Sequence, residues 1–155
     1  MAITSAICNS FKQEILVEGH NFTGRTDTFK LALYSSDSAT LSKSTTVYTA
    51  PADGTADPTN TYEVTSTSSG YTTGGNSLTS TTPVLSGDTA CCKFADTSWG
   101  STASFTARGC LIYNSTNSNK AVCAINFGAD KTVTSGTFTI QFPAQTAGNA
   151  IIQIA

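Results

Sequence analysis

The sequence predicts an all-β protein, a single sandwich or barrel-like domain of about eight or nine antiparallel strands with one short N-terminal helix. Residues 27–155 hold short segments in which apolar and polar residues alternate, the pattern of strands with one buried face. Stretches rich in Gly, Ser, Thr, Asn and Pro separate these segments about every 8–12 residues. The 155 residues suit one domain, and 39% hydrophobic residues suffice for its core. We expect residues 1–26 to form a helix and turn, and residues 27–155 the sandwich.

The segment 4–18 is predicted to be an amphipathic helix. Thr4 or Ser5 would cap its start, and Gly19 would supply the left-handed residue that ends it. One stripe of the helix is apolar at helical spacing and contains Ile7, Cys8, Phe11, Ile15 and Leu16. A short terminal helix needs fewer apolar residues than this. We therefore take Ile7, Phe11, Ile15 and Leu16 as candidate contact residues, which either close the end of the sandwich or dock on a neighbouring protein.

The remaining chain reads as strands and turns. Strands are predicted at 29–34, 47–49, 62–64, around 78, 90–95, 103–107 continuing to 111–113, 121–127, 138–142 and 151–154. Polar turns are predicted at 96–100, 114–119 and 128–132, and the turn at 114–119 would close a hairpin. The Pro, Gly and Asp content of 51–60 predicts the most mobile loop. Pro143 would stop the strand before it, because proline has no N–H to donate.

Charge and hydropathy exclude several classes of partner. Eight basic and ten acidic residues give a net charge of -2, which offers no basic field for a nucleic acid. The apolar runs are far shorter than the roughly 18 residues of a membrane span. The N-terminus also lacks a basic segment followed by an uninterrupted apolar stretch, so we expect cytoplasmic synthesis without export by a signal peptide.

Candidate catalytic residues are few. The one histidine, His20, follows a turn glycine, and Glu14, Glu18 or Asp27 could orient it as a base. Since no nucleophile accompanies this group, we interpret His20 as a solvated turn residue. The chain also lacks the spacing of His and Cys residues that holds a metal. The sequence therefore predicts a protein that is not an enzyme and uses no cofactor.

Five cysteines, an odd number, favour buried free thiols over a disulfide framework. Cys91 and Cys92 are adjacent, so in a strand they face opposite ways, and we assign Cys92 to the core face with Phe94. Cys110 and Cys123 lie on the two arms of the predicted hairpin. A disulfide between them is the alternative to two core thiols.

Two aromatic residues are candidates for a sugar-binding surface. Trp99 and Tyr71 could stack on sugar rings, as aromatic residues do in many carbohydrate-binding β-sandwich modules. Core packing is the favoured alternative for both, because 9% aromatic residues is an ordinary content for an all-β core.

Six strings together resemble a family of small all-β virion proteins of tailed bacteriophages: FKQEIL at 11–16, DTFKLALYSS at 27–36, SGYTTGGNSL at 69–78, TARGCLIYN at 106–114, AVCAINFGADK at 121–131 and GTFTIQFP at 136–143. The resemblance covers most of the chain and departs from the family at residues 51–60 and at the cysteines. None of the strings is catalytic.

This resemblance implies a non-enzymatic virion structural protein, made in the host cytoplasm. We expect a capsid decoration or cement protein that stabilises the head through contacts with the major capsid protein, with copies of itself, or with both. The alternative is a tail or fibre component that contacts a host surface carbohydrate. Neither role requires a nucleic acid or a membrane as partner.

Overall fold

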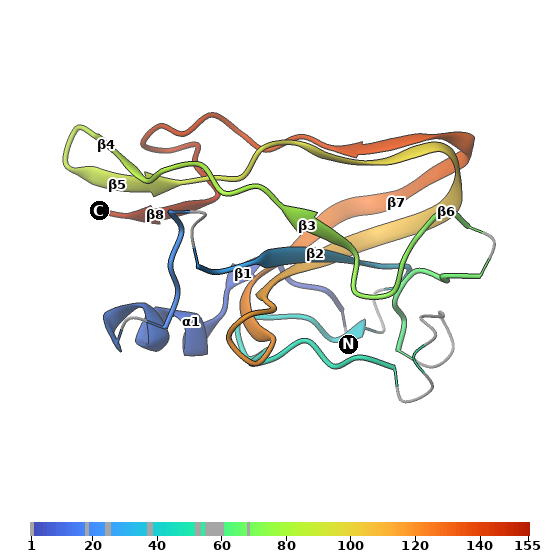
Figure 1. The fold of residues 1–155 in the computed structure, drawn as a ribbon, viewed down its shortest axis with the longest axis horizontal. Helices are drawn as coiled ribbons and strands as arrows, with labels where there is room; N and C mark the ends of the chain where they lie inside the picture. The colour runs from blue at the N-terminus through green and yellow to red at the C-terminus, as the bar shows by residue number, and fades with distance from the viewer. Residues whose placement is uncertain are drawn as a thin grey trace.

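The structure is a computed structural model that describes residues 2–17, 19–23, 26–36, 39–51, 54, 61–67 and 69–155. Within these residues the chain forms eight strands, one α-helix and one 3-10 helix (Figure 1). In chain order they are β1 (Ala6–Ile7), α1 (Asn9–Glu14), η1 (Ile15–Val17), β2 (Phe29–Tyr34), β3 (Asn76–Leu78), β4 (Val84–Ser86), β5 (Thr89–Cys92), β6 (Thr97–Asn114), β7 (Lys120–Ile140) and β8 (Ile152–Ile154).

The described strands form two antiparallel sheets, with the orders β1-β7-β6-β2-β3 and β4-β5-β8. The predicted all-β class, with about eight strands and a short helix near the N-terminus, is confirmed. The sheets remain open in this part of the chain, so the barrel alternative is wrong. Two open antiparallel sheets are consistent with a β-sandwich.

The β6–β7 hairpin dominates the molecule. Its strands pair from Thr97 opposite Ile140 to Asn114 opposite Lys120, with shifts of register near Ala103 and Gly109. Such irregularities bend a strand and increase its twist. Figure 1 shows the hairpin curving over, so that its far half lies above the half that joins β2. This bend places two layers of strands around one core.

Aromatic rings fill the space between the layers. The rings of Phe22 and Phe29 stack with centroids 4.5 Å apart, and Phe94 lies 5.4 Å from Phe29. Phe11 meets Phe22 edge to face at 6.0 Å. Each buried phenylalanine contributes about 1.5–3 kcal/mol through the apolar surface that it removes from water. The residues before position 27 thus share the core of the strands that follow.

The predicted helix over 4–18 is too long. Residues 6–7 instead form β1, which pairs with β7 through Ala6–Ala124 and Ile7–Cys123. The helix then begins after Cys8, so neither Thr4 nor Ser5 caps it. Pairing with the sheet edge satisfies backbone groups that a longer helix would have used.

Within the described residues, no helix has the length and apolar content needed to cross a bilayer.

Gly19 does not adopt the left-handed conformation expected of it. Its N–H donates to the Glu14 carbonyl over 2.8 Å, and a Cβ at this position would lie 2.8 Å from that oxygen. Any larger residue would place its Cβ against the Glu14 carbonyl, so only glycine fits at this position. Glu18, the predicted last residue of the helix, lies outside the described residues.

Two predicted turns are wrong. Residues 96–100 and 128–132 mostly continue β6 and β7, since each strand supplies partners for the other and a bulge tolerates the glycines. The predicted strands at 47–49 and 62–64 are reduced to isolated bridges, Val47 with Lys120 and Glu63 with Tyr34. The loop predicted to be mobile, 51–60, lies outside the described residues except for Pro51 and Gly54.

Candidate functional site

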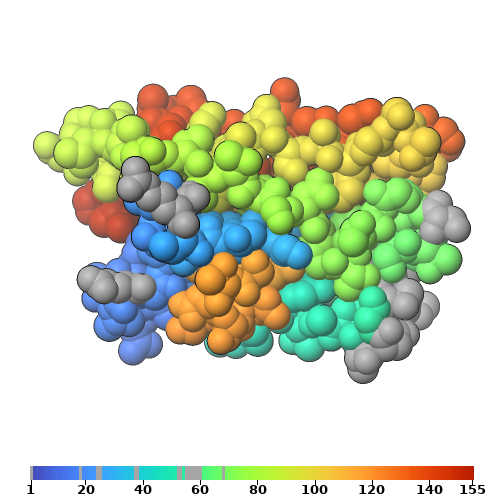
Figure 2. Space-filling model, viewed as in Figure 1, coloured from blue at the N-terminus to red at the C-terminus, as the bar shows by residue number. Residues whose placement is uncertain are grey.

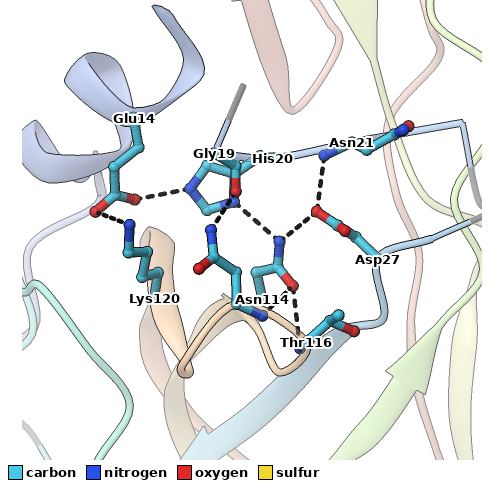
Figure 3. A network of polar contacts seen from close by, with 9 residues as sticks. Glu14, Gly19, His20, Asn21, Asp27, Asn114, Thr116 and Lys120 are labelled. Atoms are coloured by element: carbon cyan, nitrogen blue, oxygen red, sulfur yellow. Dashed lines mark hydrogen bonds and ion pairs between the residues drawn. The ribbon is translucent and has the colours of Figure 1, made fainter. Parts of the chain in front are cut away.

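His20 belongs to a buried polar network between α1 and the β6–β7 turn (Figure 3). Its Nε2 lies 2.8 Å from Glu14 Oε2, and its Nδ1 lies 3.2 Å from Asn114 Nδ2. Lys120 Nζ is 3.5 Å from the other oxygen of Glu14. The His20 side chain has no exposed surface, so its interpretation as a solvated turn residue is wrong. The polar groups that surround it come from distant parts of the sequence.

The hydrogen bonds of Asn114 determine which tautomer of the neutral His20 ring fits the network. Its Oδ1 accepts hydrogen bonds from the backbone N–H groups of Thr116 and Asn117, so its Nδ2 is the donor. That amide donates to Asp27 Oδ2 over 2.6 Å and faces His20 Nδ1. The Nδ1 atom must therefore accept, and the hydrogen stays on Nε2, toward Glu14. Both ring nitrogens are engaged within the protein, which leaves neither to take a proton from a substrate.

A second buried polar cluster, which the sequence did not indicate, surrounds Glu63. The carboxylate is fully buried and accepts hydrogen bonds from Tyr71 Oη at 2.7 Å, Gly74 N at 2.7 Å and Tyr48 Oη at 3.0 Å. Burial raises the pKa of Glu63, and the three hydrogen bonds lower it by less. A single acid in a segment of polar residues gives no sign that three donors will meet it. The cluster joins Glu63 to residues 48, 71 and 74, which lie apart in the sequence.

Tyr71 and Trp99, the candidate surface aromatics, are buried in the core. Their rings lie 6.0 Å apart, and each packs against Phe105. The Tyr71 hydroxyl also accepts a hydrogen bond from the backbone N–H of Leu33. In this fold neither ring is exposed to stack on a sugar.

The four candidate contact residues lie together at one groove. Phe11 is buried at its floor, Ile7 and Ile15 are half-buried, and Leu16 is 84% exposed. The facing wall belongs to β8, where Ile154 is 55% exposed. We call this hollow of about 380 Å³ the terminal groove; its lining residues are Ile7, Phe11, Lys12, Ile15, Leu16, Ile152, Gln153, Ile154 and Ala155. At the left end of the molecule, Figure 2 shows red C-terminal residues above the blue N-terminal segment.

The terminal groove continues along the open side of the two layers. At Ile7 it meets a hollow of about 270 Å³, which Ile125 and Ile151 also line. These two residues in turn border a larger hollow of about 480 Å³, which Phe127 and Phe138 from the two halves of β7 also line. Three neighbouring hollows, each bordered by apolar side chains, thus lie between α1 and the far half of the hairpin.

The cysteines are free thiols, and all but Cys92 are buried. Cys92, which the sequence assigns to the core face, is half-buried and packs against the core cluster that contains Phe94, whereas Cys91 is fully buried outside that cluster. Cys110 lies opposite Ile125, and Cys123 lies opposite Ile112, so the two thiols are offset by two positions along the hairpin. Burial raises the pKa of Cys8 to about 11 and that of Cys123 to about 12, which keeps both protonated.

The two polar clusters therefore have their groups satisfied by other parts of the chain, whereas the terminal groove exposes apolar side chains that nothing in the described residues covers. An exposed apolar patch of this kind is typical of a surface that binds another molecule. No known family, curated protein or solved structure matches this chain.

Proposed function

We propose that this chain is a non-enzymatic structural protein of a tailed bacteriophage virion, which decorates the head and cements neighbouring capsid subunits. The observation that carries the proposal is the terminal groove, where Leu16 and Ile154 remain exposed beside a well-packed core. The resemblance of six strings to virion proteins of tailed phages supports a phage virion as the assembly in which this protein acts. The partners would be the major capsid protein, further copies of this chain, or both.

The energetics suit a mechanical role. Apolar surface removed from water contributes about 25 cal/mol per Å², before the cost of ordering the partners is subtracted. Stable interfaces bury about 800 Å² on each partner. Repeated over a shell, modest contacts of this kind would resist internal pressure. A net charge of -2 also limits repulsion between copies that are packed side by side.

The buried polar clusters support a role without catalysis. His20 is held by Glu14 and Asn114, and Glu63 by its tyrosine and backbone donors. In both clusters the hydrogen-bonding groups are used to join segments of the fold. Catalysis by either would require a group that is free to meet a substrate.

The alternative role is a tail or fibre component that contacts host carbohydrate. It depended on two aromatic residues at the surface, and neither of them is exposed. Tyr71 and Trp99 pack inside the molecule. Tyr62, at 38% exposure, is one aromatic ring still partly available, and a single ring makes a small platform. We therefore retain the cement role.

Binding to heads tests the proposal. Purified protein should bind heads that lack it until the sites are saturated, and it should raise the temperature at which the heads rupture. Salt should change this binding little, because few charges are available to be screened. Leu16→Asp should weaken binding. Val47→Asp, which changes an exposed valine outside the groove, is the matched control and should bind normally.

Two results would contradict the proposal. If the protein fails to bind heads while particles without it no longer adsorb to host cells, the protein acts in the tail or fibre. If Leu16→Asp binds heads as well as the unchanged protein does, the terminal groove is not the contact surface.

A further inference from the structure

The β4–β5 hairpin is a second exposed apolar feature. Its strands, β4 and β5, are joined by the two-residue turn Gly87–Asp88, and Gly87 has the positive φ of 62° that a tight hairpin turn requires. Leu85 is 77% exposed and Val84 is 44% exposed. Figures 1 and 2 show this hairpin projecting at the end of the molecule that also holds α1 and the C-terminus. It therefore forms an apolar knob close to the terminal groove.

The knob and the groove lie on opposite edges of one sheet. In the order β4-β5-β8, the outer strands are β4, which carries Leu85, and β8, which lines the groove. In an antiparallel pair, alternate residues direct their N–H and C=O groups away from the partner strand. Both edges therefore hold backbone groups suited to pairing with a further strand.

The charges of the two features are opposite. Asp88 at the tip is the one charged residue in the segment 84–92. Lys12 is the one charged side chain among the described residues that line the groove, and its neighbour at 3.5 Å is the neutral side chain of Asn9. Both charged side chains are exposed. A hairpin entering the groove could thus bring a carboxylate to an ammonium group at the rim.

From the exposed apolar residues, the open backbone edges and the opposite charges of the two features, we infer that the terminal groove receives the β4–β5 hairpin of a second copy of this chain. Leu85, the more exposed of the two apolar residues, fills the space between α1 and β8, and Asp88 pairs with Lys12. Because hairpin and groove lie at the same end of the molecule, two copies related by a two-fold axis can exchange hairpins and make the contact twice. The inference rests on the proposed function in that it names the partner of the same groove.

The size of the contact sets its strength. One hairpin of this length covers less than the roughly 800 Å² per partner of a stable interface, and the reciprocal exchange doubles the area. We therefore expect a dimer that forms reversibly and depends on protein concentration. Sedimentation equilibrium over a range of concentrations measures it directly.

Charge reversal identifies the contact. Asp88→Lys and Lys12→Asp should each weaken the dimer about tenfold or more, since each places like charges together. An equimolar mixture of the two variants should restore dimers, because every hairpin then meets a groove of opposite charge. Lys131→Asp, at an exposed position outside both features, is the control and should leave the dimer unchanged. All the variants should melt as the unchanged protein does.

The inference is overturned if the protein remains monomeric at every concentration, or if the mixture fails to restore the dimers that the single variants lose. A dimer that neither variant alters would also overturn it, since another surface would then hold the copies together. Head binding of the Asp88→Lys protein, measured separately, distinguishes this result from the proposed function. If the monomeric protein still raises the rupture temperature of the heads, the proposed cement function stands and the dimer is not needed for it.

Discussion

At the scale of single residues, Glu63 is the most informative side chain. It is fully buried and makes three hydrogen bonds, but burial still raises its pKa. The folded protein therefore holds the proton more tightly than the unfolded chain. Above the unfolded pKa of about 4.3, unfolding releases this proton. The stability that Glu63 contributes is thus present at low pH and is lost as the pH rises through its folded pKa.

Glu63→Gln tests this sign, because glutamine resembles the protonated acid. Its oxygen can accept from Tyr71 and Gly74, and its amide can donate to the Tyr48 hydroxyl. As the pH rises above about 4.3, the unchanged protein should lose stability relative to the variant, by about 1.4 kcal/mol for each unit by which the pKa is raised. Urea unfolding at several pH values measures this difference. A difference that grows in the opposite direction would show that the carboxylate form is preferred.

At the scale of elements, the apolar residues of α1 and η1 lie in two different environments. Phe11 packs against Phe22 and the His20 ring, whereas Leu16, in the following turn η1, is exposed. Phe11→Ala should lower the free energy of unfolding by about 3–5 kcal/mol. Leu16→Ala should change it by less than about 0.5 kcal/mol. Denaturant unfolding of both variants checks the pair, and equal effects would mean that the two environments are not as the structure shows.

The approach of the 74–75 turn to β2 depends on Gly75. This residue has a φ of 73°, and a Cβ would lie 1.7 Å from the carbonyl oxygen of Leu31. Gly75→Ala should therefore destabilise the protein by more than about 4 kcal/mol or prevent folding. Gly87 has a similar φ of 62° in open space, so Gly87→Ala should cost only about 1–2 kcal/mol for the left-handed conformation. Thermal melts that rank the two variants in the opposite order would contradict this placement of β3 against β2.

At the scale of the whole molecule, burial of the thiols should make the protein less stable at alkaline pH. The folded protein raises the pKa of Cys8 to about 11 and that of Cys123 to about 12 by burial. The unfolded chain releases these protons near the ordinary thiol pKa of about 8.5. Stability should therefore fall as the pH rises above about 8.5. Thermal melts between neutral and alkaline pH measure the loss, and Cys123→Ala should reduce it.

Thiol labelling gives an independent check. At pH 8 the folded protein should react slowly with iodoacetamide at its four buried cysteines, and it should react completely once it is unfolded. A reducing agent should leave the melting temperature unchanged, because the thiols are free. A large fall in melting temperature on reduction would instead require a disulfide.

Much of the fold follows from local patterns. Alternation of apolar and polar residues predicts a strand wherever one face is buried, and the strands at 29–34 and near the C-terminus lie close to their predicted places. The polar turn at 114–119 closes a hairpin as expected. Each of these features depends on residues that are neighbours in the chain. The sequence by itself therefore determined the all-β class, the short helix and the β6–β7 hairpin.

Only the tertiary structure decided how far the strands extend and what surrounds each polar side chain. β6 and β7 run through two predicted turns because each provides backbone partners for the other. His20 is buried because Glu14 and Asn114, which are far apart in the sequence, satisfy both of its nitrogens. The terminal groove forms where α1 meets β8, from opposite ends of the chain. The cost of burying a polar group, or of exposing an apolar one, depends on contacts between distant segments, and these exist only in the folded molecule.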